Sequence, residues 1–116
     1  MGSDKIHHHH HHMFYEIRTY RLKNGAIPAY LKVVEDEGIE IQKSHLGELV
    51  GYFFSEIGPI NEIVHIWAFS SLDDRAERRA RLMADPRWLS FLPKIRDLIE
   101  VAENKIMKPA RFSPLM

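Results

Sequence analysis

One stretch decides the fold of this chain: HLGELVGYFFSEIGPINEIVHIWAFSSLDDRAERRARLMADPRW, which runs from His45 to Trp88. Within it, two apolar segments, residues 48–57 and 63–70, flank the turn sequence GPIN at positions 58–61. Two strand-like segments with a short connection predict a β-hairpin. The arginine-rich segment that follows has apolar residues at helical spacing, so it predicts an amphipathic helix.

The segment before the hairpin predicts a strand and a helix. Residues 14–22 alternate between the two sides of an extended chain, with the period of two that is typical of a strand. After Asn24 and Gly25, apolar residues recur at three- to four-residue spacing on a helix whose first turn accepts Pro28. Gly38 in the middle of this helix indicates either close packing or a bend. Gly47 is expected to cap its end.

The segment after the hairpin predicts a broken helix. Ser71, followed three positions later by Asp74, forms a capping-box pattern that opens a helix to about residue 83. Asp85 and Pro86 then restart the helix as an N-cap followed by proline at the first helical position. The apolar stripe of this second part reaches residue 99, and Pro93 inside it is expected to kink the helix or displace its boundary.

Residues 101–108 alternate again and predict a fourth strand. The resulting β-α-β-β-α-β order is ferredoxin-like, and it predicts an α+β domain with a four-stranded antiparallel sheet, strand order 4-1-3-2 and helices on one face. Both faces of this sheet carry apolar side chains, although a sheet covered on one side normally shows polar residues on the other. We assign Tyr15, Ile17, Tyr52, Phe54, Ile63, Trp67 and Phe69 to one face, and Phe14, Tyr20, Phe53, Val64 and Ile66 to the other. A second copy would cover the remaining face, which predicts a homodimer that buries on the order of 1,500 Å² or more.

Composition limits the class of protein. The first twelve residues, MGSDKIHHHHHH, are an expression tag, so we expect one domain over residues 13–116. Basic and acidic residues both number 16, so no overall charge favours nucleic acid or another acidic partner. The chain has no cysteine, which excludes disulfides and cysteine-based metal sites. No apolar run approaches the roughly 20 residues that span a bilayer, so we expect no membrane association and a cytoplasmic location.

Polar side chains on apolar strands are the candidates for function, because burying them without a partner costs free energy. Arg18, Tyr20 and His65 are the candidate catalytic residues, since the first and third strands are expected to be neighbours. Beside a cavity between sheet and helices, Arg18 would bind a carboxylate and His65 would move a proton. The candidates for ligand binding are Trp67, Glu56, Glu103 and Asn104. The alternative is a structural network of Arg–Glu or His–Tyr pairs that fixes register at a dimer interface.

Two further patterns have structural interpretations. His45 and His65 are the two histidines outside the tag, and no HxH or HxxxH spacing brings them together, so we expect no metal site. His45 lies near the end of the first helix, where it is expected to interact with the last carbonyl groups or the helix dipole. The arginines between Arg75 and Arg87 alternate with acidic residues at helical spacing, as in Asp74 and Arg78. This pattern predicts a solvated helix with internal ion pairs.

Three blocks of the chain resemble the NIPSNAP family: YEIRTYRLKNG at 15–25, the block from His45 to Trp88, and ENKIMKPARFSPL at 103–115. The resemblance extends over residues 14–115 and implies the dimeric α+β barrel of that superfamily. The biochemical role of the family is largely unassigned, so no catalytic residue set carries over. Cofactor-free oxygenases, isomerases and haem enzymes share the barrel, and an enzymatic role for this chain therefore rests on fold analogy.

The sequence and the resemblance together lead to two functional hypotheses. We expect an uncharacterised NIPSNAP-like homodimer without a bound cofactor, which acts as a small-molecule-binding or protein-interaction module. The alternative is a cofactor-independent oxygenase or isomerase that acts on a small hydrophobic or aromatic substrate, using His65 with Arg18 or Tyr20. The sequence leaves open the ligand, the physiological partner and any assembly beyond the dimer.

Overall fold

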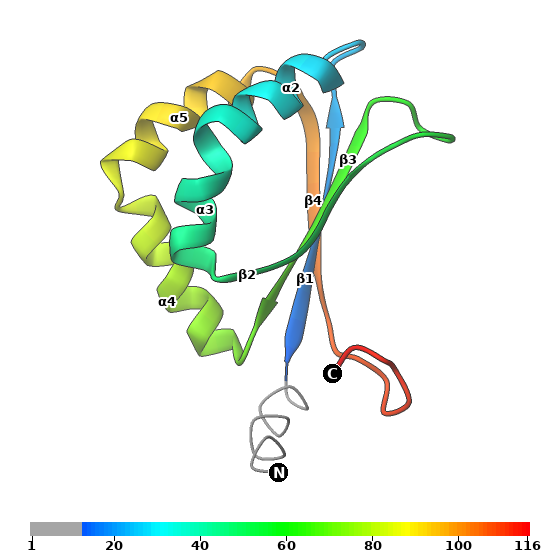
Figure 1. Cartoon of the computed structure of the whole chain (residues 1–116), viewed down its shortest axis with the longest axis vertical. Coiled ribbons are helices and arrows are strands. Elements are labelled where there is room, and N and C mark those ends of the chain that lie inside the picture. Colours follow the sequence, from blue (N-terminus) through cyan, green and yellow to red (C-terminus); the bar gives the residue numbers. More distant parts are fainter. Residues whose placement is uncertain (1–12) are drawn as a thin grey trace.

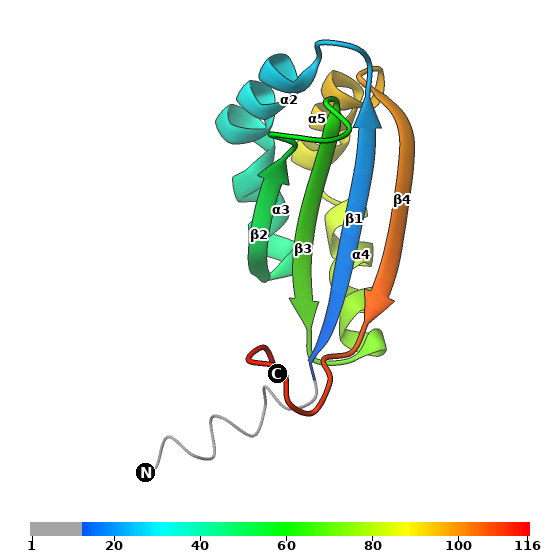
Figure 2. The ribbon, with the colours of Figure 1, turned by 90° about the vertical axis from the view of Figure 1, so that its right-hand side faces the viewer.

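Four antiparallel strands form one sheet, and the helices cover one of its faces (Figures 1 and 2). The computed structural model describes residues 13–116, and the expression tag predicted at residues 1–12 lies outside the described residues. The strands follow each other across the sheet in the order β2-β3-β1-β4, so the predicted chain order and the predicted strand order 4-1-3-2 are confirmed. The elements are β1 (Phe14–Leu22), α2 (Ile27–Val33), the π-helical segment η1 (Val34–Gly38), α3 (Ile39–Leu46), β2 (Glu48–Phe54), β3 (Glu62–Phe69), α4 (Leu72–Met83), α5 (Pro86–Arg96) and β4 (Ile99–Met107).

Strands β2 and β4 show the largest differences from the predicted bounds, and β3 lies one residue earlier than predicted. β2 ends at Phe54, three residues early, and Ile57 and Ile60 lie exposed in the loop that follows, so their apolar character does not reflect strand pairing. β4 begins at Ile99, which the helical periodicity places in the preceding helix. That helix continues through Pro93 and ends at Arg96, and Ile99 then pairs with β1. An apolar residue at the boundary fits either period, and the sheet determines which one holds.

The register between strands decides which side chains share a face. Ile17 pairs with Ile66, whereas Arg18 pairs with His65 on one side and with Asn104 on the other. The prediction that both faces carry apolar side chains holds, but the assignment of the β1 residues is wrong. Tyr15 and Ile17 share a face with Phe53, Val64 and Ile66, whereas Phe14 and Tyr20 lie on the helix-covered face with Trp67 and Phe69. Alternation can be read within one strand, but the offset between strands depends on contacts that are distant in sequence.

The helix-covered face of the sheet forms the core. Its strand residues pack against α2, α3, α4 and α5, which lie together on that side in both views (Figures 1 and 2). The opposite side, which we call the open face, carries no helix from residues 13–116. The buried apolar residues are Tyr20, Leu22, Ala26, Tyr30, Val34, Leu46, Ile63, Trp67, Phe69, Leu82, Trp88, Phe91 and Ile95.

Gly38 closes the π-helical segment and lies against Phe91 of α5. A Cβ atom added at Gly38 would overlap the Phe91 ring, so only glycine lets the two helices approach this closely. Of the two alternatives predicted for Gly38, close packing or a bend, the structure shows close packing. Short π-helical segments are frequent at functional sites, and Val34 of this one lines the cavity described below.

Side-chain caps start α4 and α5 at the predicted residues. Ser71 Oγ accepts a hydrogen bond from the Asp74 N–H at 2.9 Å, and Asp85 accepts one from the Arg87 N–H at 2.8 Å. His45 Nε2 lies 2.8 Å from Asp85 Oδ2, so this histidine connects the end of α3 to the start of α5.

Candidate functional site

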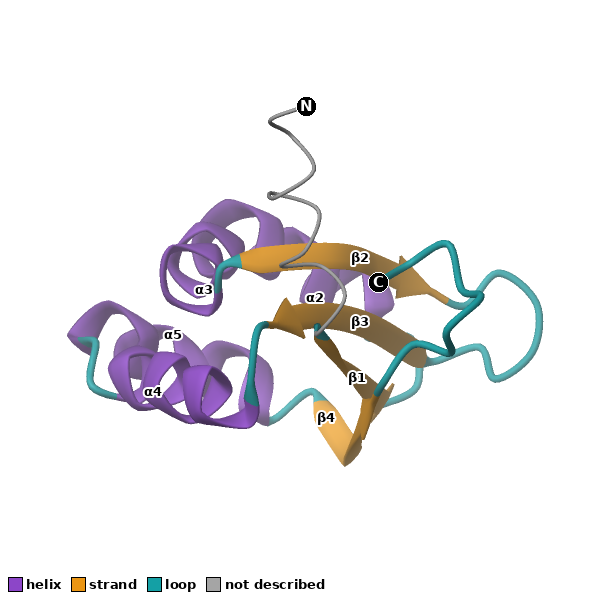
Figure 3. Ribbon diagram, turned by 90° about the horizontal axis from the view of Figure 1, so that it is seen from below, coloured by secondary structure: helices purple, strands orange, loops and turns teal. Residues whose placement is uncertain are grey.

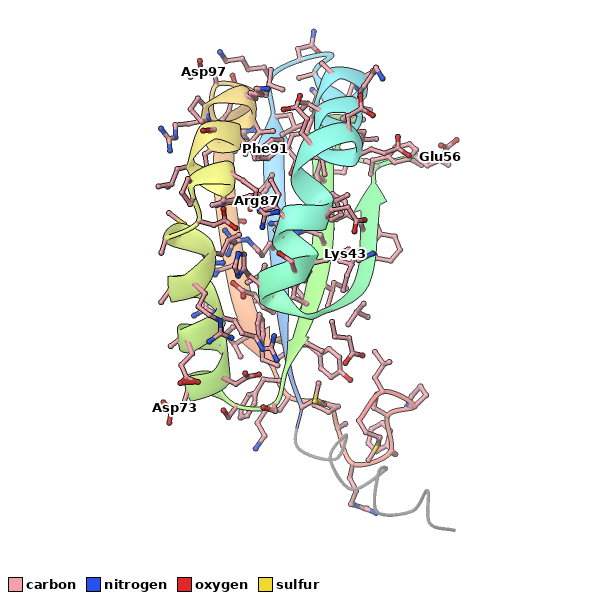
Figure 4. The ribbon with its side chains drawn as sticks, turned by 60° about the vertical axis from the view of Figure 1, so that its left-hand side comes forward. Lys43, Glu56, Asp73, Arg87, Phe91 and Asp97 are labelled. Atoms are coloured by element: carbon pink, nitrogen blue, oxygen red, sulfur yellow. The ribbon has the colours of Figure 1, made fainter. Side chains whose placement is uncertain are left out.

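A cavity of about 430 Å³ lies between the helix-covered face of the sheet and the helices, as the sequence predicts. Figure 4 shows Phe91, one of its lining residues, between α5 and the α2–α3 helices. Aromatic and aliphatic side chains form most of the wall, and a few charged or amide groups interrupt it. This mixture is typical of small-molecule sites. The lining residues are Arg18, Tyr20, Tyr30, Val34, Gln42, Tyr52, Arg79, Leu82, Met83, Trp88, Phe91, Leu92, Ile95, Arg96, Ile99, Glu100 and Ala102.

Glu16 is a buried carboxylate on β1 that organises the basic groups beside this cavity. Only 1% of the residue is exposed. Arg75 Nε and Nη2 donate to its two oxygens at 2.9 and 3.0 Å, Arg18 Nη1 donates at 2.8 Å, and Asn104 Nδ2 donates at 2.7 Å. Burial alone would raise the pKa of Glu16, but these hydrogen bonds and the two positive charges outweigh it and lower the pKa to about 2. Glu16 is therefore ionised at neutral pH, and it positions two guanidinium groups.

Arg18 and Tyr20, two of the predicted site residues, do line the cavity. Arg18 Nε donates to the Tyr20 hydroxyl at 2.9 Å, and the same guanidinium bonds to Glu16. Two more hydroxyl groups lie in the wall, those of Tyr30 and Tyr52. Their oxygens are 2.7 Å apart and form a hydrogen bond. Burial raises the pKa of Tyr30 and of Tyr52 well above the ordinary value, so both hydroxyls stay protonated and act as hydrogen-bonding groups.

His65 lies deeper than the cavity wall. Its ring is fully buried, stacks on Tyr52 at a centroid distance of 4.5 Å and meets the edge of Tyr20 at 5.0 Å. Its Nδ1 accepts a hydrogen bond from Trp67 Nε1 at 2.8 Å, which assigns the proton to Nε2, and Nε2 has no partner within residues 13–116. Burial, followed by the charge of Arg18, lowers the pKa of His65 to about 3. Tyr20 and Tyr52 thus separate a neutral imidazole from the cavity.

Arg79 of α4 is a half-buried arginine that lines the cavity. Burial disfavours its charged form, and the nearby Arg18 and Arg75 add to that effect, so the pKa of Arg79 is lowered although Glu16 opposes the change. Within residues 13–116 its guanidinium makes no ion pair, whereas Arg75 bonds to Glu16 and Arg78 bonds to Asp74. Arg18 and Arg75 therefore bond to the buried carboxylate, whereas Arg79 lies near this cluster without bonding to it.

The remaining predicted ligand residues lie apart from the cavity. Trp67 is fully buried and serves as the hydrogen-bond donor to His65. Glu56 lies in the exposed β2–β3 loop, at the far edge of the molecule from Phe91 (Figure 4). Glu103 belongs to the open face, next to Thr19, and Asn104 is a partner of Glu16. The structure therefore brings Arg18 and Tyr20 to the cavity, places His65 and Asn104 behind it, and leaves Glu56 and Glu103 elsewhere.

Two important residues, Arg75 and Arg79, were interpreted from the sequence as part of a solvated helix. The ion pair expected between Asp74 and Arg78 is present at 2.9 Å, but Arg75 and Arg79 point to the sheet. A signal in the sequence could have shown this difference. Arg75, Arg79 and Leu82 are spaced four and three residues apart, so they share one helix face, and a leucine on that face predicts contact with the core.

Residues 13–116 contain neither a cluster of metal ligands nor a helix that could span a membrane. These residues contain no group of three or more histidine, aspartate or glutamate side chains that could hold a metal ion. None of the helices in the described part of the chain is long and apolar enough to cross a membrane.

Comparison with known proteins identifies close relatives. A NIPSNAP family protein from Agrobacterium tumefaciens has a solved structure that matches this chain with a TM-score of 0.89 and 50% identity, covering 90% of this chain and all of the other. A NipSnap homologue from Dictyostelium discoideum is 30% identical over 98 residues, which are 84% of this chain and 43% of that protein. The chain thus spans less than half the length of this curated relative.

More distant structures share the fold alone. A protein named as a candidate antibiotic biosynthesis monooxygenase from Nitrosomonas europaea matches with a TM-score of 0.64 and 15% identity, over 88% of this chain and 94% of the other. The family assignment rests instead on the NIPSNAP family model, which matches residues 15–114. Because that match covers nearly all of the described chain, this protein belongs to the NIPSNAP family, whose activity is uncharacterised.

Proposed function

We propose that this chain is a small-molecule-binding module that works as a homodimer. The observation that carries the binding function is the cavity of about 430 Å³ with its apolar wall and few polar groups. Ligand cavities usually have volumes of about 300–1,000 Å³ and the same mixture of lining residues. The π-helical segment at Val34 and the contact between Gly38 and Phe91 support this proposal, because they shape the helices on one side of the cavity.

A ligand that fills the cavity should stabilise the folded protein. A ligand at a concentration of 100 times its Kd should add about 2.7 kcal/mol to the free energy of unfolding. Thermal unfolding in the presence of aromatic and acyl compounds measures this effect. Ala102→Phe, which fills cavity space from the edge strand β4, should remove the stabilisation. The matched control Ala84→Phe lies at an exposed helix end outside the cavity and should retain it. Absence of stabilisation across the panel would contradict the proposal.

The open face of the sheet supports the homodimer. It carries apolar side chains, and in the described part of the chain no helix covers it (Figure 1). The β2–β3 loop and the C-terminal residues extend on this same side (Figure 3), and they carry the exposed side chains Ile57, Ile60 and Phe112. Two open faces packed together would reach the roughly 1,200–2,000 Å² that stable interfaces bury. The apolar residues of the open face are Tyr15, Ile17, Phe53, Val64, Ile66, Val101 and Met107.

Ile66→Lys should convert the dimer into monomers. Ile66 pairs with Ile17 in the middle of the open face, and the two-fold symmetry of a dimer would bury two added charges. A penalty of several kcal/mol would raise the dissociation constant by about 100-fold or more. Sedimentation velocity at micromolar concentration measures the change. Leu89→Lys on the exposed side of α5 introduces the same charge and should leave the dimer intact. A wild-type chain that sediments as a monomer would disprove the homodimer.

A cofactor-independent oxygenase or isomerase is the second candidate function. The hydroxyls of Tyr20, Tyr30 and Tyr52 at one cavity support it, as does the direct contact between Tyr20 and His65. In such an enzyme, Tyr20 would lie between the His65 imidazole and a substrate in the cavity and would contact both. The two functions differ in the fate of a bound compound. A binding module returns it unchanged after incubation in air, whereas an enzyme yields a product that mass spectrometry detects.

Two other expectations from the sequence stay predictions. The exposed β2–β3 loop supports a protein-interaction role, but a second copy of the chain would occupy the same side of the sheet. The cytoplasmic location and the lack of a nucleic-acid partner rest on composition alone.

A further inference from the structure

The charges beside the cavity do not balance. Glu16 accepts hydrogen bonds from Arg75 and Arg18, so this one carboxylate already serves two guanidinium groups. Arg79 lies near the same cluster, lines the cavity and makes no ion pair within residues 13–116. Arg79 is half-buried, and taking a charge partly out of water without a counter-charge is unfavourable. Arg79 is therefore the guanidinium of this cluster that lacks a negative partner within residues 13–116, and it lies on the cavity side.

The shape of that missing group follows from the chemistry of arginine. A guanidinium presents its N–H groups in a planar fork that matches the two oxygens of a carboxylate. Trp88, Phe91 and Ile95 offer apolar contact, and the other polar lining groups are Gln42, Arg96, Glu100 and the tyrosine hydroxyls. A doubly charged head group fits less well, because Glu16 lies within the cluster and Glu100 lines the cavity.

We infer that the cavity selects small carboxylic acids with an apolar body, and that the acid's carboxylate binds the guanidinium of Arg79 while the body lies against Trp88 and Phe91. This inference rests on the proposed binding function and specifies its ligand class. Arg79 is then a specificity residue: it distinguishes an acid from an alcohol of the same size. Arg75 has a different role, because its bonds to Glu16 hold the cluster in place.

Matched ligands test this inference. Octanoate, octan-1-ol and octylamine share one apolar body, as do 2-naphthoate, 2-naphthylmethanol and 2-naphthylmethylamine. Calorimetric titration of the wild-type protein should show that the acid of at least one series binds about 10- to 100-fold more tightly than the alcohol, the gain expected for hydrogen bonds between charged groups. The amine should bind more weakly than the alcohol, because it adds a positive charge to a basic cluster.

Arg79→Gln should remove the preference for the acid, so that the acid and the alcohol of each series bind with similar affinity. Its thermal stability provides a second readout. Loss of an unpaired charge next to Arg18 and Arg75 should leave the melting temperature unchanged or raise it, whereas loss of a structural residue would lower it. Arg81→Gln is the matched control, because Arg81 belongs to the same helix, is exposed and does not line the cavity.

The possible results separate the two proposals. Equal affinity for acid and alcohol in the wild-type protein would overturn the carboxylate inference while the binding function stands. Tighter binding of octyl phosphate than of octanoate would overturn the choice of head group. An unchanged acid preference in Arg79→Gln would overturn the role of Arg79. Binding of none of these compounds would overturn the inference together with the proposed binding function.

Discussion

Replacing Glu16 with glutamine is expected to lower the free energy of unfolding by about 3–5 kcal/mol, the effect typical of removing one partner from a buried ion pair. Glutamine has the shape of glutamate but carries no charge, and its amide nitrogen would face the donors of Arg75 or Asn104. Arg18 and Arg75 would then lie beside Arg79 without a counter-charge. Urea denaturation of the wild-type and variant proteins at neutral pH measures the loss.

The matched control for this variant is Glu40→Gln, the same chemical change on an exposed side chain of α3. Its nearest basic group, Lys43 Nζ, is 3.8 Å away at the surface, so the free energy of unfolding should change by no more than about 0.5 kcal/mol. A loss below about 1 kcal/mol in Glu16→Gln would mean that the arginines do not depend on this carboxylate. The double variant Glu16→Gln, Arg75→Gln should lose less than the sum of the two single changes, because both act on one pair.

The fold could be predicted because its signals are local. The alternation of residues 14–22, the Ser71 cap and the pair Asp85–Pro86 each depend on neighbours along the chain, and each predicted element is present. The offset between strands has no such local signal, so Tyr15 and Ile17 were placed on the wrong face. The end of β2 was wrong for a related reason. Ile57 is apolar yet 92% exposed, and pattern alone does not distinguish such a residue from one in a strand.

The site could be predicted only in part, because the sequence spacing of a charged residue is the same whether its side chain lies in solvent or in a buried cluster. Arg18 and Tyr20 were identified by their place on an apolar strand, and both line the cavity. Arg75 and Arg79 lie on a helix whose composition is strongly charged, so ion pairs within the helix explained them equally well. Their distinct role depends on Glu16, which lies 59 residues before Arg75 in the chain.

His65 should make the protein less stable as the pH falls from 6.5 to 4.5. Its pKa is about 3 in the folded chain and ordinarily 6.5, so between these values the unfolded chain binds more protons than the folded chain. The contribution of the neutral imidazole to the free energy of unfolding is therefore complete above pH 6.5, and it is lost as the pH decreases. One pKa unit corresponds to about 1.4 kcal/mol, so the loss over this interval should be about 2–3 kcal/mol. The ionised Glu16 also loses its contribution to stability, but only below its ordinary pKa of 4.5. The effects of His65 and Glu16 on stability therefore fall in different pH ranges.

His65→Gln should flatten this dependence, because glutamine does not titrate and its carbonyl oxygen is an acceptor for the Trp67 N–H that now bonds to Nδ1. The variant should be less stable than the wild-type protein at pH 7 and should lose little further stability by pH 4.5. His45→Gln removes the other histidine of the domain, which is partly buried beside Asp85, and this variant should retain the loss of stability attributed to His65. Urea denaturation at several pH values compares the three proteins. A wild-type stability that is constant from pH 6.5 to 4.5 would show that the imidazole accepts a proton in the folded state. His65 would then reach solvent or the cavity, which is what the enzymatic alternative requires.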